Sequence, residues 1–372
     1  MTELDSTAAV APADEVTSTR EIPLEFRGSA REYFRIWIVN LCLTLLTLGV
    51  FSAWAKVRKK RYFYSSIRID DTPFQYLAEP LPILKGRIIA VVLFAVYWFS
   101  SSFYLPALPW VMAAGLVVAP WVIARSMAFN TRYSAFRNMT FHFRGNYLGA
   151  AQTIYWLGLI PLLVAGTMFE WWGHWQAAGF AFLGFAVLFP WWLNRLKRYL
   201  MSYTAYGGAY GRYAARGGQF FRVYFLAGLI LIGGGILSSF VMFNLLPGST
   251  DADWLLVLAS VPLYLTYLLA YAFVQAHTSN LVWNHTRLGP LGFSSTLTGG
   301  GMARLYFTNA LGILGSLGLL IPWAVMRSLK YRADNMSVLV QGDLAALSGD
   351  RVSAVQAAGA EMGEIFDMDL SL

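Results

Sequence analysis

The sequence predicts a polytopic α-helical membrane protein, on the basis of its composition, its apolar stretches and a repeated motif. The chain is 57% hydrophobic and only 13% charged, whereas soluble domains carry about 25% charged residues. Six apolar stretches follow one another as three pairs, and most approach the ~20 residues that cross a bilayer core. The motif Trp-x3-Arg-x3-Tyr/Phe closes four long apolar stretches. Four copies indicate an internally repeated protein.

The N-terminal part precedes the paired stretches. Residues 1–21 form an acidic tail that is expected to be disordered. Residues 22–28 have the pattern of a short strand that ends at a turn glycine. The first apolar element, residues 33–54, is followed by a cluster of Lys and Arg. An Asp-Asp pair then supplies the turn of a candidate β-hairpin over residues 65–77.

The six paired stretches are predicted to be transmembrane helices that form three hairpins. They cover residues 88–104 with 108–124, 147–169 with 177–193, and 223–246 with 254–274. The connections within each pair carry no Lys or Arg, whereas the segments between pairs are basic. The positive-inside rule therefore predicts that the segments between pairs are cytoplasmic.

Strand-like runs in the cytoplasmic segments are expected to form short β-hairpins that pair into a small sheet, because isolated hairpins are marginally stable in water. The glycine-rich copy over residues 204–218 departs from this strand pattern. Residues 22–345 are predicted to be a single integral membrane domain with internal repeats. An acidic C-terminal tail follows over residues 346–372.

The first and last apolar elements are related by a constant offset of 269 residues, at which nine residues coincide. Two topologies follow from this relation. Either each end element spans the membrane, which gives eight spans in total, or each is re-entrant and turns back within the bilayer. The repeat favours the re-entrant form, with breaks near residues 47–49 and 316–318, because the flanking signatures face the cytoplasm in the middle copies.

The first end element also carries a family resemblance. Phe26-Arg27-Gly28, Tyr33–Asn40, Leu46–Gly49 and Trp54–Arg58 with Tyr62 resemble the bacterial YjgN family of inner-membrane proteins. The resemblance covers about residues 22–345. It implies a multi-pass protein of the bacterial cytoplasmic (inner) membrane, from a family with no established substrate, cofactor or catalytic residues.

The repeated motif and two asparagines within apolar runs supply the candidate functional residues. The four motif arginines are Arg58, Arg125, Arg195 and Arg327. Either each arginine snorkels to the cytoplasmic headgroups, or some of them converge to bind an anionic solute or lipid headgroup. Asn40 and Asn309 lie within apolar runs, where each either hydrogen-bonds across helices or lines a polar path as part of a pseudo-symmetric pair. The predicted interfacial anchors are Trp54, Tyr62, Trp121, Trp191, Tyr199, Trp323 and Tyr331.

Several function classes are disfavoured by the sequence. The four histidines show no metal-ligand spacing, and the chain has neither a P-loop nor a nucleophile motif. We therefore expect no enzyme, no metal and no cofactor. The formal net charge of +8 is what basic cytoplasmic loops produce, so no nucleic-acid partner is expected.

Two functions remain. One is a channel or transporter-like protein for a small solute, since internal repeats with broken helices are typical of transporter cores. The alternative is a non-enzymatic membrane scaffold or lipid-binding protein that docks partners through its cytoplasmic β-sheet. A membrane enzyme that acts on lipids is the least favoured class. The expected partners are membrane lipids and an unknown small solute or protein, and the sequence leaves the oligomeric state open.

Overall fold

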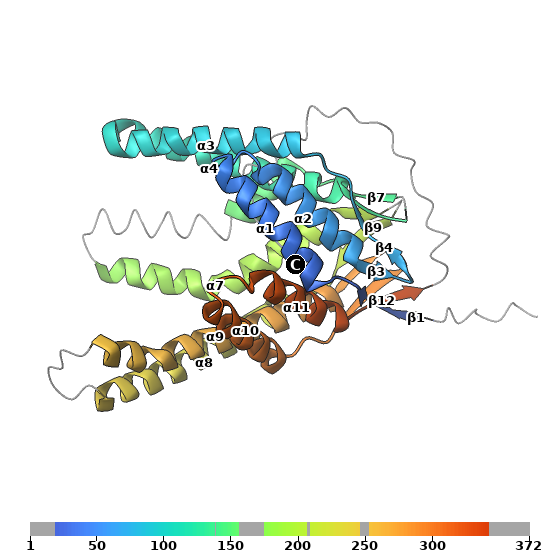
Figure 1. Ribbon diagram of the computed structural model, residues 1–372. Coiled ribbons are helices and arrows are strands. Elements are labelled where there is room, and N and C mark those ends of the chain that lie inside the picture. Colours follow the sequence, from blue (N-terminus) through green and yellow to red (C-terminus); the bar gives the residue numbers. More distant parts are fainter. Residues whose placement is uncertain (1–18, 138, 156–174, 207–208, 246–252, 342–372) are drawn as a thin grey trace, which may run out of the picture.

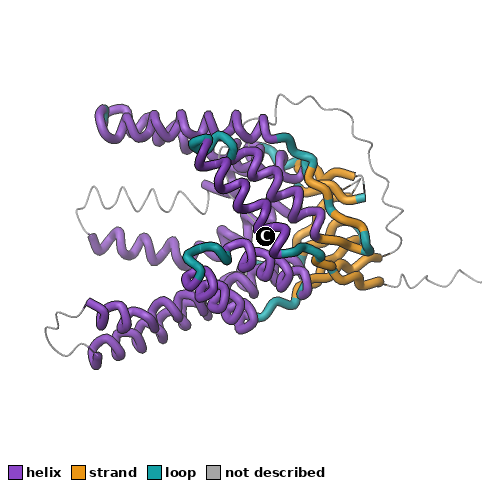
Figure 2. Tube along the Cα trace, viewed as in Figure 1, coloured by secondary structure: helices purple, strands orange, loops and turns teal. Residues whose placement is uncertain are grey.

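Helices fill one end of the molecule and strands gather at the other, as Figure 1 and Figure 2 show. The computed structural model describes residues 19–137, 139–155, 175–206, 209–245 and 253–341. Each pair of helices begins and ends beside strands, so the strands form a common base from which the helices extend.

The helices follow one another in pairs along the chain. The pairs are α1 (Ala30–Leu46) with α2 (Ser52–Ser66), α3 (Pro80–Phe103) with α4 (Leu108–Arg132), α5 (Tyr147–Ile154) with α7 (Trp175–Ser202), α8 (Gly217–Leu245) with α9 (Asp253–Asn284), and α10 (Gly299–Gly315) with α11 (Ile321–Asp334). A short 3-10 turn, η1 (Leu105–Ala107), joins α3 to α4. The second helix of each pair packs against the first helix of the next pair, and α11 packs against α1. The helices therefore follow a ring.

The strands are short and lie between the helical pairs. They are β1 (Thr19–Pro23), β2 (Glu25–Phe26), β3 (Ile67–Ile69), β4 (Thr72–Pro73), β5 (Gln75–Tyr76), β6 (Ser134–Phe136), β7 (Met139–Phe143), β8 (Thr204–Tyr206), β9 (Ala209–Tyr213), β10 (Thr286–Leu288), β11 (Leu291–Ser295) and β12 (Met336–Gln341). A nine-stranded sheet has the order β1-β12-β11-β10-β9-β8-β7-β6-β5, and a three-stranded sheet has the order β2-β3-β4. The pairings are antiparallel.

The two sheets join into a closed ring of strands. Only Leu24 separates β1 from β2, and its amide donates to the carbonyl of Met336 at 3.0 Å. Only Phe74 separates β4 from β5, and its amide donates to the carbonyl of Ile67 at 3.2 Å. The pairings therefore lead from β1 through the nine-stranded sheet to β5, on through β4, β3 and β2, and back to β1. Ring closure leaves no open sheet edge in this circle.

The interior of the strand ring is a hydrophobic core. Its buried members come from every hairpin of the ring: Ile22, Ile69, Phe136, Tyr206, Leu288, Leu291, Val338 and Val340. The one polar group among them is satisfied, since the Tyr206 hydroxyl donates to the carbonyl of Phe136 at 3.0 Å. The ring is therefore filled by side chains rather than open along its axis.

The ring contains five repeats, each made of a strand, a helical pair and a further strand. In each repeat the second helix contains an alanine or proline fourteen residues before the first residue of the strand that follows. In the first repeat this residue is Ala53 on α2, and the strand begins at Ile67. The equivalent residues are Pro120, Pro190, Ala272 and Pro322, and all five have buried positions against neighbouring helices. The sequence motif identified four of these repeats. The missed copy is in α9, where Ala272, Phe273, His277 and Leu281 occupy the positions of Pro, Trp, Arg and Tyr.

The predicted fold class, six transmembrane helices or eight with spanning end elements, is wrong. Within the described residues, three helices are long and apolar enough to cross a membrane: Pro80–Phe103, Leu105–Arg132 and Gly217–Asn244. Helices α1, α2, α10 and α11 have 17, 15, 17 and 14 residues, fewer than the ~20 of a membrane span.

The other three predicted stretches are not among these three candidates. The stretch 147–169 lies mostly outside the described residues, which follow α5 only to Ile154. The stretches 177–193 and 254–274 form the apolar parts of α7 and α9, and each helix continues through a polar part to the strands. For the end elements, hydropathy overestimated the number of spans because apolar side chains such as Ala53 and Leu305 pack helix on helix.

The predicted short β-hairpins are present, but the expectation of a small sheet is wrong, because the hairpins join into a nine-stranded sheet that closes into a ring with the three-stranded one. The glycine-rich copy over residues 204–218, which departs from the strand pattern, contributes β8 and β9. The end elements do turn back at the residues named from the sequence. α1 ends at Leu46 and α2 begins at Ser52, while α10 ends at Gly315 and α11 begins at Ile321.

Candidate functional site

The motif arginines lie on four different helices of the ring. Arg58, Arg125 and Arg195 are exposed on α2, α4 and α7. The Arg125 guanidinium lies 5.9 Å from the ring centre of Trp121, which is four residues earlier on the same helix. Arg327 on α11 is half-buried and lies 5.1 Å from the ring centre of Trp323 in the same way. The arrangement places a cation beside an aromatic ring in at least two repeats.

Arg327 and Asn309 are the two candidate residues that the structure brings together. The Arg327 guanidinium donates to the Thr308 hydroxyl at 2.6 Å and to the Asn309 side-chain oxygen at 3.3 Å. The Asn309 amide nitrogen donates to the Ala324 carbonyl at 3.2 Å and to the Ser328 hydroxyl at 3.1 Å. These contacts join α10 to α11 within one hairpin.

The pseudo-symmetric residue Asn40 is less well satisfied. Its amide nitrogen donates to the Ala55 carbonyl at 3.5 Å, which joins α1 to α2. Its side-chain oxygen is buried and has no hydrogen-bond partner among the described residues. The two amides therefore occupy the same position in their hairpins, and each contacts the carbonyl of a residue fifteen positions later.

The motif tyrosines contact the start of the paired helix. The Tyr62 hydroxyl accepts from the amide of Ser29 at 2.8 Å, and the Tyr199 hydroxyl donates to the carbonyl of Asn146 at 2.9 Å. The Tyr331 hydroxyl lies 3.3 Å from that of Thr298. Ser29, Asn146 and Thr298 are the N-cap residues of α1, α5 and α10. The spacing of the motif therefore places a phenol against a helix N-terminus.

Two short helical hairpins create a step in the helical end of the molecule. The pair α1–α2 and the pair α10–α11 are neighbours in the ring because α11 packs against α1. In Figure 1 these blue and red-brown pairs end well before α3–α4 on one side and α8–α9 on the other. Leucines at and beside the two reversals are exposed; we call Leu45, Leu46, Leu48, Leu314 and Leu317 the step leucines.

The backbone at both reversals has a left-handed conformation. Leu48 has φ 50° and Leu317 has φ 51°, and each precedes a glycine, Gly49 with φ 93° or Gly318 with φ 91°. Glycine adopts such angles without cost, but leucine does not. The side chains of Leu48 and Leu317 are 96% and 95% exposed, so they gain no packing within the protein. One signal for both leucines is present in the sequence, since they belong to the nine coincidences at the offset of 269.

Arg87 lies beside one of these reversals and was missed by sequence reasoning. It is half-buried on α3, directly before the apolar stretch that begins at Ile88. Its guanidinium donates to the Ser52 hydroxyl, which in turn donates to the carbonyl of Gly49. A charged side chain is thus fixed next to the exposed turn of the first short hairpin.

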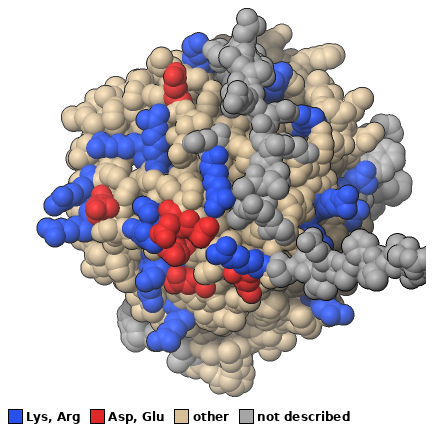
Figure 3. Space-filling view, turned by 90° about the vertical axis from the view of Figure 1, so that its right-hand side faces the viewer, with Lys and Arg blue, Asp and Glu red and all other residues tan. Residues whose placement is uncertain are grey.

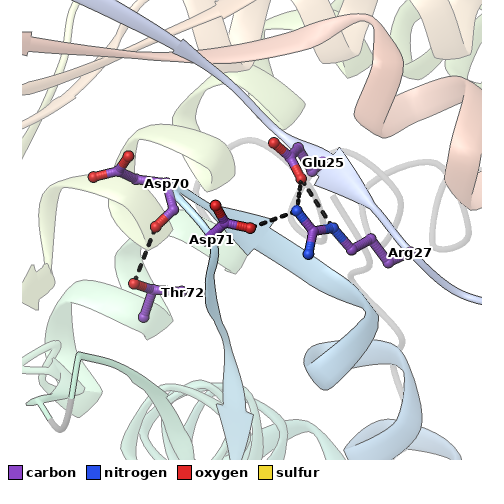
Figure 4. Close-up of polar contacts among 5 residues, drawn as sticks. All are labelled: Glu25, Arg27, Asp70, Asp71 and Thr72. Atoms are coloured by element: carbon purple, nitrogen blue, oxygen red, sulfur yellow. Dashed lines mark hydrogen bonds and ion pairs between the residues drawn. The ribbon is translucent and has the colours of Figure 1, made fainter.

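Figure 3 shows the strand end of the molecule, where Lys and Arg are spread widely and many Asp and Glu gather in one cluster. In Figure 4, Arg27 lies between Glu25 and Asp71, and Thr72 donates to the Asp70 carbonyl. Hydrogen bonds to Glu25 and Asp71 raise the pKa of Arg27 above its usual value. Asp70 also pairs with Arg137 at 3.3 Å, which links two neighbouring hairpins.

The opposite part of the ring wall is basic. Arg212 on β9 and Arg287 on β10 are directly opposite in the pairing register, and both are exposed. Like charges in such a pair are destabilising. In the part of the chain that the structure describes, no group of three His, Cys, Asp or Glu side chains is arranged to hold a metal ion.

Comparison with known proteins gives one family match. Residues 21–365 match the model described as "Bacterial protein of unknown function (DUF898)". The chain is 25% identical over 150 residues to the inner membrane protein YjgN of Escherichia coli K12, which covers 39% of this chain and 36% of that protein. It is 26% identical over 123 residues to YjgN of Salmonella typhimurium, with 32% and 31% covered. Each alignment thus spans about a third of the relative's own length. Neither the family description nor these names carry an enzymatic activity, and no solved structure matches.

Proposed function

Because the chain belongs to the DUF898 family of bacterial proteins and is an inner-membrane protein, we propose that it binds membrane lipid at the step formed by its two short helical hairpins. The step leucines would contact the acyl chains, while α3 and the α8–α9 pair flank them. The long neighbouring helices expose many apolar side chains as well, as a surface in contact with lipid does.

The observation that carries this proposal is the conformation of Leu48 and Leu317. A non-glycine residue in the left-handed region costs roughly 1–2 kcal/mol, and neither side chain offsets that cost by burial in the protein. Asn or Gly would satisfy the backbone better. Backbone strain of this kind is typical of functional positions. A leucine that is strained and exposed in two repeats is favourable where its surroundings are lipid.

The transporter hypothesis from the sequence has less support. A path for a small solute would have to pass the strand ring along its axis or leave beside it. The ring interior holds Ile22, Ile69, Phe136 and their equivalents, which exclude a wet passage. Asn40 and Asn309 use their amide nitrogens for carbonyls within their own hairpins rather than presenting both to a common path.

A scaffold role has one specific observation in its favour. Arg212 and Arg287 face each other across β9 and β10, and neither has an ion pair among the described residues. A fold that keeps two like charges opposite each other gives up some stability. An acidic segment of a partner protein would relieve this repulsion, so the basic wall is the part of the ring best suited to docking.

The lipid proposal is tested by the double variant Leu48→Asn/Leu317→Asn. Asn tolerates the left-handed region, so we expect the protein in detergent to unfold at the same or a higher temperature. We also expect a loss of at least about half of the co-purified phospholipid, because two exposed apolar contacts are removed. Lipid phosphorus per mole of purified protein and the unfolding temperature with added bacterial phospholipid are the two measurements.

The control is Leu93→Asn/Leu229→Asn, which removes two exposed leucines from α3 and α8 in ordinary helical backbone. Equal lipid retention in both double variants would refute a specific role of the step. Rapid flux of small solutes in proteoliposomes that the step variant abolishes would instead restore the transporter hypothesis.

A further inference from the structure

Arg87 is a charged side chain at the start of an apolar helix, and the repeats show that the fold does not need it there. Its position in the repeat is defined by two offsets. Arg87 lies seven residues after the first residue of α3, and its partner Ser52 lies fifteen residues before Ile67, the first residue of the strand that follows α2. At the same two positions of other repeats the structure has aromatic pairs. These are Phe189 with Tyr224 at 5.4 Å and Tyr271 with Tyr306 at 5.5 Å between ring centres. An uncharged contact therefore suffices to hold the second helix of one repeat to the first helix of the next.

The guanidinium of Arg87 has unused hydrogen-bonding capacity. Arginine carries five N–H donors, and within the described residues one of them donates, to the Ser52 hydroxyl. Among all residues that the structure describes, no carboxylate forms an ion pair with Arg87. A charged group at the boundary of an apolar helix is costly unless it is paired or solvated. Several donors in a planar fork are suited to the oxygens of a phosphate.

The surroundings of Arg87 are those of a lipid headgroup rather than of a free anion. Ser52 links Arg87 to Gly49, and Gly49 follows the exposed Leu48. Ile88 and Val91 on α3 are exposed apolar side chains beyond Arg87 along the helix. Lys56 is one helical turn after Ser52 on α2, so it adds positive charge to the same helix face. A cation therefore borders an apolar surface on the side where the basic segments are expected to be cytoplasmic.

We propose that Arg87, supported by Lys56, binds the phosphate of an anionic phospholipid in the cytoplasmic leaflet, with the acyl chains over the step leucines. This inference rests on the proposed lipid binding and adds the lipid class and its headgroup contact. Basic sites between membrane helices are a recurrent way of holding acidic lipid headgroups.

The test compares Arg87→Gln, Arg87→Lys and the matched control Arg222→Gln in the full-length protein. Arg222 is an exposed arginine near the start of α8, another apolar helix, and it is not one of the motif arginines. Each protein is titrated in detergent with phosphatidylglycerol, with phosphatidylcholine and with inorganic phosphate. Binding is followed by the shift of the unfolding temperature and by native mass spectrometry.

We expect phosphatidylglycerol to bind the parent protein and the Arg222→Gln control more tightly than phosphatidylcholine does. Arg87→Gln should bind phosphatidylglycerol about tenfold more weakly, the usual scale for loss of a charged hydrogen bond. Arg87→Lys should fall between them, because it keeps the charge and loses the planar fork. Inorganic phosphate should give no comparable shift at equal concentration.

The outcomes separate the two proposals. If Arg87→Gln keeps its preference for phosphatidylglycerol, the headgroup contact is refuted while lipid binding at the step leucines stands. Equal stabilisation by inorganic phosphate would assign Arg87 to a free anion and also overturn the inference. If neither lipid binds the parent protein, the proposed function falls with it.

Ser52→Ala separates a ligand contact from a purely structural clamp. It removes the hydroxyl between Arg87 and Gly49 but leaves the guanidinium. We expect Ser52→Ala to keep the preference for phosphatidylglycerol. A variant that loses the preference as completely as Arg87→Gln does, and unfolds at the same lowered temperature, would show that Arg87 acts only as a clamp.

Discussion

At the scale of single residues, the repeated motif joins helix ends as well as placing aromatic rings beside arginines. The repeated motif identified Tyr62, Tyr199 and Tyr331 as candidate interfacial anchors, because aromatic residues near basic ones are typical of a membrane boundary. Their hydroxyl groups contact the N-cap residues of partner helices. A linear sequence gives the spacing of such a residue but not its partner, since Tyr199 and Asn146 are 53 positions apart.

Tyr199→Phe tests this capping contact. Tyr199 is buried, and its hydroxyl donates to the carbonyl of Asn146. We expect the substitution to lower the free energy of unfolding by about 1 kcal/mol, because it leaves the carbonyl without this donor. Denaturant unfolding in detergent measures the change. Tyr203→Phe is the control on the same helix end, where the tyrosine is exposed, and it should have no measurable effect.

Arg87 shows the limit of sequence reasoning at this scale. A basic residue before an apolar stretch is read as a loop charge, since cytoplasmic loops of membrane proteins are rich in Lys and Arg. Two other repeats have aromatic pairs at the positions of Ser52 and Arg87, namely Phe189 with Tyr224 and Tyr271 with Tyr306. Only the structure shows that these positions are equivalent. Alignment of the repeats by their structure, rather than by letters, identifies the substitution of an aromatic pair by a charge.

At the scale of helices and hairpins, the reversals could be predicted and the number of spans could not. Leu48-Gly49 and Leu317-Gly318 coincide at the constant offset of 269 residues, and this coincidence located both reversals. A glycine repeated at the same position indicates a backbone that needs a positive φ. Hydropathy cannot tell an apolar residue that faces lipid from one that packs on another helix. Ala53, Val57 and Met326 are examples that are buried between helices of short hairpins.

Gly318→Ala tests the reversal of the second short hairpin. Gly318 has φ 91°, which an alanine adopts at a cost of roughly 1–2 kcal/mol. We expect the unfolding temperature in detergent to fall accordingly. The control is Gly315→Ala, three residues earlier at the end of α10, where an added Cβ meets open space. There the better helix propensity of alanine should leave stability unchanged or slightly raised, and an equal loss at both positions would contradict the role assigned to the turn.

At the scale of the whole molecule, the decisive feature is the closure of the strand ring by β1 and β12. The sequence predicted a short strand at residues 22–28, but it contained no sign that this strand pairs with β12. Their contact joins residues as far apart as Glu21 and Ser337. The fifth repeat was missed for a related reason, because Ala272, Phe273 and His277 keep the packing positions while changing the letters of the motif.

Ile22→Asp tests ring closure. Ile22 on β1 is buried in the core of the strand ring opposite Val338 on β12. A carboxylate there has no counter-charge in that core, so we expect a loss of at least about 3 kcal/mol of stability, or failure to obtain folded protein. Arg20→Ala on the same strand is the control, because the Arg20 side chain is 70% exposed. Similar yields and unfolding temperatures for both variants would show that β1 is dispensable for closure.

The pairing of β1 with β12 also governs how the protein is made. A ribosome delivers β1 first and β12 after more than three hundred further residues, so the first strand remains unpaired throughout synthesis. A nascent chain that stops early leaves both neighbours of the gap as exposed strand edges, which attract other chains. Since only a chain that reaches Gln341 can complete the circle, ring closure distinguishes finished molecules from truncated ones and exposes the latter to proteases and chaperones.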